Sequence, residues 1–85
     1  MAETTETVSG KIRSYVAREY FPGNEDDLKD DTRLISDGHI DSVAVMVLVD
    51  FLEKSFGVEF EPYEVDADNL DSISLMSEFV LGKLG

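Results

Sequence analysis

The sequence predicts a small all-α domain with three main helices, one short helix, and a long loop between the first two main helices. The chain has 85 residues, which suffices for one domain with one core. Apolar residues recur at helical spacing in three segments. The sequence contains no cysteine, so neither a disulfide framework nor a cysteine metal site can hold the core together. We therefore expect residues 1–85 to form a single domain stabilised by apolar packing.

The first helix is expected from about Thr5 to Tyr20. Its apolar positions fall on one helix face because they are spaced by three or four residues; they are Val8, Ile12, Tyr15, Val16 and Tyr20. Pro22 and Gly23 follow and end the helix. The next segment is polar and rich in turn formers, which predicts a long loop. Leu28 and Leu34 are its apolar residues and are expected to reach the core.

The second helix is expected to begin at Asp41 or Ser42, either of which can act as N-cap, and to end at Gly57. One apolar stripe contains Val45, Leu48, Val49, Leu52 and Phe56, and a second contains Val43, Met46, Val47 and Phe51. A helix with so much apolar surface either lies centrally or carries an exposed docking face. Met46 is expected in the core, whereas Val43 and Val47 are left open between core and docking surface. The valines also suit a β-strand, but the length of the run favours a helix.

The remainder of the chain predicts a connector and two further helical segments. Residues 58–63 alternate and contain Pro62, which restricts the residue before it, so we expect an extended segment. Residues 64–70 predict one short helical turn with Val65 and Leu70 facing inward. Asp71 or Ser72 then caps a last helix. The apolar positions of that helix are Ile73, Met76, Phe79, Val80 and Leu84.

The charge distribution limits the classes of partner. Nineteen acidic and seven basic residues give a formal net charge of -12, which disfavours nucleic acid and anionic membranes and favours weak, fast docking onto basic protein surfaces. Self-repulsion favours a monomer. Residues 37–85 hold eleven acids and two bases, a net charge of -9, so we expect this half to face partners. The first residues lack the pattern of a secretory signal, and no apolar stretch reaches the length of a membrane span, so a cytoplasmic location is expected.

The sequence argues against two kinds of site, a catalytic triad and a calcium loop. His39, Asp41 and Ser42 are the residue types of a nucleophilic triad, but neighbours on one turn cannot align around an oxyanion hole. The closely spaced acids before the last helix lack the glycine and glutamate of an EF-hand loop. We therefore predict neither an enzyme nor a metal site.

Ser42 lies in an unusual local setting. It follows a glycine-containing turn at the positive end of a long helix, where backbone N–H groups and the helix dipole favour an attached phosphate. Taken alone, a plain helix cap is the commoner role for such a serine. However, the stretch LISDGHIDSVAVMVLVDFLEKSFG resembles the signature of acyl carrier proteins, with Gly38, Asp41, Ser42 and Val43 at the matching positions. The order of the predicted elements is similar to that family over nearly the whole chain.

This resemblance implies an acyl-carrier-protein-like bundle that acts as a stand-alone carrier. It implies that the Ser42 hydroxyl is esterified by the phosphate of 4'-phosphopantetheine, which a separate phosphopantetheinyl transferase takes from coenzyme A. Acyl or aminoacyl cargo would then be held as a thioester. The implied partners are ligases, acyltransferases or synthases of fatty-acid, polyketide or related biosynthesis. The alternative is an unmodified acidic interaction module in which Ser42 is only a helix cap.

Partner recognition is expected around Ser42 and along the second helix. By resemblance, carriers of fatty-acid synthesis usually have leucine after the serine and acids two and five positions beyond it. This sequence has Val43, Ala44 and Val47 there, so apolar surface replaces part of the acidic face. The later segment EVDADNLDSI also resembles that of aminoacyl carriers. The expected recognition residues are Asp41, Val43, Val47, Asp50 and Glu53.

Overall fold

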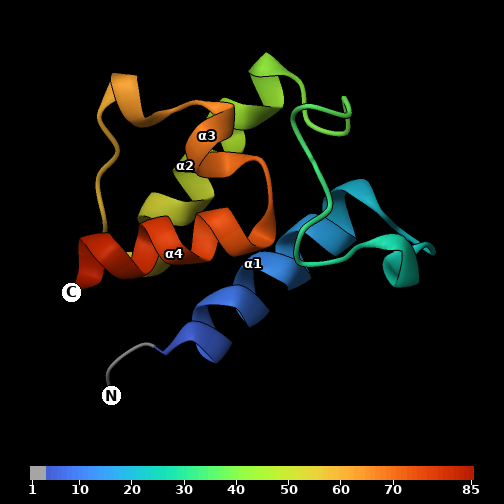
Figure 1. Cartoon of the computed structure of the whole chain (residues 1–85), viewed down its shortest axis with the longest axis horizontal. Helices are drawn as coiled ribbons and strands as arrows, with labels where there is room; N and C mark the ends of the chain where they lie inside the picture. Colours follow the sequence, from blue (N-terminus) through green and yellow to red (C-terminus); the bar gives the residue numbers. More distant parts are fainter. Residues whose placement is uncertain (1–3) are drawn as a thin grey trace.

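The expected helices all appear in the computed structural model, which describes residues 4–85 (Figure 1). The elements are α1 (Thr5–Tyr20), α2 (Ser42–Phe56), α3 (Ala67–Leu70) and α4 (Ile73–Leu84), with single 3₁₀ turns η1 (Glu25–Asp27) and η2 (Pro62–Glu64). No strand occurs within residues 4–85. The predicted all-α class, with three main helices and one short one, is confirmed.

Helix α4 is the element that joins the others. It packs mainly against α1 and also contacts α3 and α2, and Figure 1 shows it lying above α1, with α3 above it and α2 passing behind it. The long segment between α1 and α2 covers one end of the bundle in the same view. The start of α2 therefore lies at the outer end of this loop, on the side of the bundle away from α1.

A single cluster of buried apolar side chains fills the space between the helices. The first α2 stripe is buried throughout, and in α1 the predicted stripe is buried except for Tyr20, which is half-buried. Burying such a side chain is favourable by about 1.5–3 kcal/mol relative to leaving it in water. Among the apolar positions named for α4, Leu84 is exposed because the last turn of α4 extends past the core residues.

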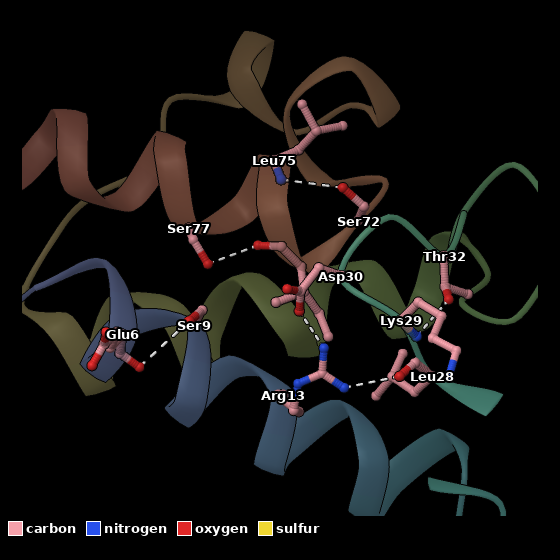
Figure 2. Close-up of polar contacts among 11 residues, drawn as sticks. Glu6, Ser9, Arg13, Leu28, Lys29, Asp30, Thr32, Ser72, Leu75 and Ser77 are labelled. Carbon is pink, nitrogen blue, oxygen red and sulfur yellow. Dashed lines mark hydrogen bonds and ion pairs between the residues drawn. The ribbon is translucent and has the colours of Figure 1, made fainter. Parts of the chain in front are cut away.

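The long loop is held to the bundle at two predicted positions and by polar contacts that the sequence did not indicate. Leu28 and Leu34 are buried, as expected. Arg13 of α1 donates to the Leu28 carbonyl at 2.9 Å and forms an ion pair with Asp30 (Figure 2). The amide of Ser74 donates to the Asp30 carbonyl at 3.0 Å. The loop is therefore tied to both α1 and α4.

The connector after α2 differs from the prediction at its end. Pro62–Glu64 forms the 3₁₀ turn η2 instead of continuing in an extended conformation. Proline suits the first position of a helical turn because its φ angle is already fixed and its missing N–H is not needed there. The Glu64 carboxylate accepts the Glu61 amide at 2.7 Å and closes the turn.

Candidate functional site

The turn before α2 brings Ser42 to the surface. Leu34 and Ile40 are fully buried at the two ends of this turn, and the Ile40 amide donates to the Leu34 carbonyl at 2.9 Å. Gly38 has a φ of 81°, a left-handed conformation that side-chain-bearing residues rarely adopt. The buried ends fix the turn, and Asp41 and Ser42 then emerge exposed.

Asp41, and not Ser42, is the side-chain cap of α2. The Asp41 carboxylate accepts the Ala44 amide at 2.8 Å, and Ser42 is the first helical residue. Within residues 4–85, no hydrogen bond of the chain uses the Ser42 hydroxyl. The structure thus decides between the two residues that the sequence left open, and it leaves Ser42 exposed.

An apolar pocket of about 360 Å³ opens beside Ser42, between the start of α2 and α3. The apolar lining comes from the turn, from α2 and from the α3 region; its residues are Ile35, Val45, Met46, Val65 and Ala67. Ser42 also lines this pocket. A serine and an apolar pocket are therefore adjacent on the same face.

The outer face of α2 next to Ser42 is apolar. Val43, Met46 and Val47 are 75%, 61% and 57% exposed, whereas the opposite stripe of α2 fills the core. The expectation that Met46 is a core residue was therefore wrong. The core contacts of α2 are taken by the other stripe, and Met46 lies outside the core, where it lines the pocket beside Ser42. Phe51, the fourth member of the second stripe, is half-buried because it stacks on Tyr15 with ring centroids 4.1 Å apart.

The two acids predicted for partner recognition on α2 both have partners within the chain. Asp50 forms an exposed ion pair with Lys54 at 3.0 Å. Glu53 is half-buried and accepts the Phe60 amide at 2.8 Å, which ties the connector to α2. Neither carboxylate is therefore without a partner in the chain.

Asp71 is the residue of this site that sequence reasoning missed. One of its carboxylate oxygens accepts the amides of Ile35 and Ser36 at 2.8 and 2.9 Å, and the other accepts the Ser36 hydroxyl at 2.6 Å. Its own carbonyl accepts the Leu34 amide at 2.6 Å. The sequence indicated Asp71 only as a possible cap of α4, but Ser72 has that role and accepts the Leu75 amide at 3.1 Å (Figure 2). No local pattern connects residues 35 positions apart.

The charge of Asp71 is favoured by these contacts. Burial, the largest single influence, pushes the pKa of its carboxyl upward. The hydrogen bonds from Ser36 and Ile35, together with the nearby Arg33, outweigh burial and hold the pKa of Asp71 below its ordinary value. Asp71 is therefore an ionised acceptor at neutral pH.

Other polar residues near the site have structural contacts. The His39 ring lies against Phe21 with centroids 4.9 Å apart. Asp66 caps α3 by accepting the Asn69 amide at 3.1 Å. Within residues 4–85, no group of three or more histidine, cysteine, aspartate or glutamate residues is arranged to hold a metal ion.

None of the helices in residues 4–85 has the length and apolar character needed to cross a membrane.

Comparison with known proteins identifies no family for this sequence. No protein-family model and no curated protein matches the sequence.

Proposed function

We propose that the protein is an acyl carrier protein whose Ser42 carries a 4'-phosphopantetheine group and presents acyl or aminoacyl cargo to partner enzymes. The observation that carries this proposal is the exposed Ser42, whose hydroxyl has no hydrogen-bond partner within residues 4–85 and which lines an apolar pocket. The resemblance of residues 34–57 to the carrier signature supports the same role. In this proposal the chain carries cargo and does not catalyse the chemistry itself.

The residues around Ser42 fit an attached phosphopantetheine. Asp41 satisfies the Ala44 amide, so the serine oxygen can be esterified without removing the cap of α2. Ser42 lies in the first turn of α2, where the helix dipole favours negative charge. When bound, the group supplies a thiol on which cargo is held as a thioester. The chain has no cysteine, so no protein thiol competes with it.

The apolar pocket and the exposed face of α2 have separate roles in the proposal. The pocket lining can shelter an apolar part of the cargo, because aliphatic surface removed from water is stabilised. Val43, Met46 and Val47 form a docking surface for the phosphopantetheinyl transferase and for ligases, acyltransferases or synthases. The predicted monomeric state and cytoplasmic location remain predictions.

The modification is tested by intact-protein mass spectrometry after incubation with coenzyme A, magnesium and a broad-specificity phosphopantetheinyl transferase. In the expected reaction the Ser42 oxygen bonds to the pantetheine-bearing phosphorus, the pyrophosphate bond of coenzyme A breaks, adenosine 3',5'-bisphosphate leaves, and the serine proton is released. We expect a mass gain of one phosphopantetheine in the wild type and in Ser74→Ala, a control at another exposed serine. Ser42→Ala should gain nothing. A folded wild type that gains no mass contradicts the proposal and leaves the acidic interaction module.

The docking surface is tested by transfer kinetics with the variant Val43→Ser/Val47→Ser. Both positions are exposed, so we expect the free energy of unfolding to change by less than about 0.5 kcal/mol per site. If the surface contacts the transferase, kcat/KM should fall about tenfold through a higher KM, the effect of losing about 1.4 kcal/mol of contact energy. Leu75→Ser, an exposed apolar position on α4, is the control. Equal kinetics for the wild type and the double variant would remove this surface from the proposal.

A further inference from the structure

Asp71 accepts hydrogen bonds from the backbone of the turn that precedes Ser42. Its carboxylate accepts three hydrogen bonds, all from Ile35 and Ser36, and its carbonyl accepts the Leu34 amide. These donors lie in the first half of the turn, and the Ile40 amide, near its end, donates back to Leu34. The turn is therefore closed on itself, and Asp71 holds its backbone in addition to the buried side chains of Leu34 and Ile40.

Asp71 also connects this turn to the opposite side of the pocket. It follows the last residue of α3, and its amide donates to the carbonyl of Ala67 at 3.0 Å. Ala67 and Ile35 both line the pocket beside Ser42, one from each side. A displacement of Asp71 would thus alter the turn and the pocket opening together.

We propose that Asp71 is a positioning residue that holds the Ser42 turn in the conformation that the phosphopantetheinyl transferase recognises. This inference rests on the proposed function. Hydrogen bonds to an ionised acceptor are stronger than neutral ones, and here they fix main-chain atoms directly. When only a fraction of the molecules has the recognised conformation, the apparent affinity falls by that fraction. Asp71 therefore acts on KM for the apo carrier and leaves kcat in the bound complex unchanged.

The test compares Asp71→Ala with Asp71→Asn and with Asp68→Ala. Asp71→Ala removes all three side-chain acceptor contacts, whereas Asp71→Asn keeps an oxygen that can accept the two amides. Asp68→Ala removes one exposed charge from α3 and serves as the matched control. Each variant is assayed with the transferase at a temperature where its melting curve shows it to be folded. Amide hydrogen exchange at Ile35 and Ser36 is measured on the same samples, because it reports the hydrogen bonds to residue 71 independently of any transfer reaction.

We expect Asp71→Ala to raise KM about tenfold with kcat nearly unchanged, the result of a turn that is competent about one tenth of the time. Exchange at the two amides should accelerate in this variant. Asp71→Asn should recover most of the wild-type KM, and Asp68→Ala should match the wild type in both readouts. Unchanged KM in folded Asp71→Ala, or unchanged exchange at Ile35 and Ser36, would overturn the inference.

The inference can still be tested if Asp71→Ala does not fold, and its failure can be told apart from failure of the proposed function. If Asp71→Ala does not fold, Ser36→Ala removes only the 2.6 Å hydroxyl contact at an exposed position. It should still raise KM and the exchange rate of its own amide, and no change in either contradicts the inference. If the wild type gains no phosphopantetheine, the proposed function and the inference fall together. If the wild type is modified and Asp71→Ala has the same kinetics, only the inference falls.

Discussion

The two segments that flank α2 are held in different ways. The turn before α2, residues 34–41, is fixed through backbone donors on the Asp71 carboxylate and through two fully buried side chains, Leu34 and Ile40. The connector after α2, residues 57–66, has one buried apolar residue, Val58. It is also held by an ion pair at 2.8 Å between Lys83 of α4 and Glu64, and by the Phe60 amide, which donates to the Glu53 carboxylate at 2.8 Å.

The difference lies in how much of the main chain the contacts fix, since Asp71 accepts two amides of the turn, whereas Glu53 accepts one amide of the connector and the second tie is an ion pair. A carboxylate that accepts backbone amides fixes the main chain, whereas an ion pair fixes the ends of two long side chains and costs their conformational entropy. Lys83 is partly shielded, and its Nζ lies 5.5 and 5.1 Å from the ring centroids of Phe60 and Phe79. We therefore expect the segment before Ser42 to be the more rigid of the two.

The largest difference is expected for the apolar anchors. Leu34→Ala should lower the free energy of unfolding by about 2–5 kcal/mol, because it leaves a cavity at a fully buried site. Val58→Ala should cost less, about 1–2 kcal/mol, because it removes two methyl groups at a nearly buried site. Urea unfolding followed by circular dichroism measures both values. Equal losses would show that the connector depends on its anchor as strongly as the turn does.

The stabilising contributions of the Asp71 and Glu64 carboxylates should differ in their salt dependence and share the same pH dependence. The pKa of Glu64 is held below its ordinary value first by the Lys83 ammonium and then by the Glu61 amide, and the pKa of Asp71 is lowered as well. A carboxyl whose pKa is lower in the folded state stabilises the fold above its unfolded pKa, and this contribution is lost as pH falls through the folded pKa.

The variants that measure this are Asp71→Asn and Glu64→Gln. Asp71→Asn should cost about 1 kcal/mol at neutral pH, because an ionised acceptor becomes neutral. Its difference from the wild type should be constant above about pH 5 and shrink below about pH 4. The cost of Glu64→Gln should follow the same pH trend and also shrink in about 1 M salt, whereas that of Asp71→Asn should persist. Salt-insensitive costs for both variants would contradict the distinction between the two segments.

The cap of α2 gives an intermediate effect. Asp41→Ala should cost about 0.5–2 kcal/mol because the Ala44 amide loses its acceptor. Ser42→Ala should change the free energy of unfolding by less than about 0.5 kcal/mol, because the structure gives the cap to Asp41. From the sequence alone, Ser42→Ala was equally able to lower the free energy of unfolding by the amount expected for a lost helix cap. Thermal unfolding of the two variants side by side separates the roles, and the reverse order of costs would return the cap to Ser42.

Much of this fold follows from local sequence patterns. The bounds of α1, the buried stripe of α2 and the two loop leucines depend on spacing and on turn residues, which act over a few positions. Pro62 was interpreted only through its effect on the preceding residue, and so the 3₁₀ turn that it begins was missed.

The parts of the site that could not be predicted depend on tertiary structure. Met46 and Val45 are both apolar residues of one helix, and only the placement of the other elements exposes one and buries the other. The hydrogen bonds from Ile35 and Ser36 to Asp71 join segments far apart in the sequence and have no local sequence signature. Exposure of Ser42 beside an apolar pocket also required the structure, because α3 forms one side of that pocket.

The smallest effect is expected for the exposed ion pair on α2. The Lys54 and Asp50 side chains are 78% and 58% exposed, so Lys54→Ala should cost no more than about 0.5 kcal/mol, and less in high salt. Lys83→Ala should cost more, because that lysine is 22% exposed and also contacts two aromatic rings. Thermal unfolding at low and high salt measures both. Since Lys54→Ala leaves the fold intact and removes the partner of Asp50, its effect on transferase KM then reports whether Asp50 contributes to docking.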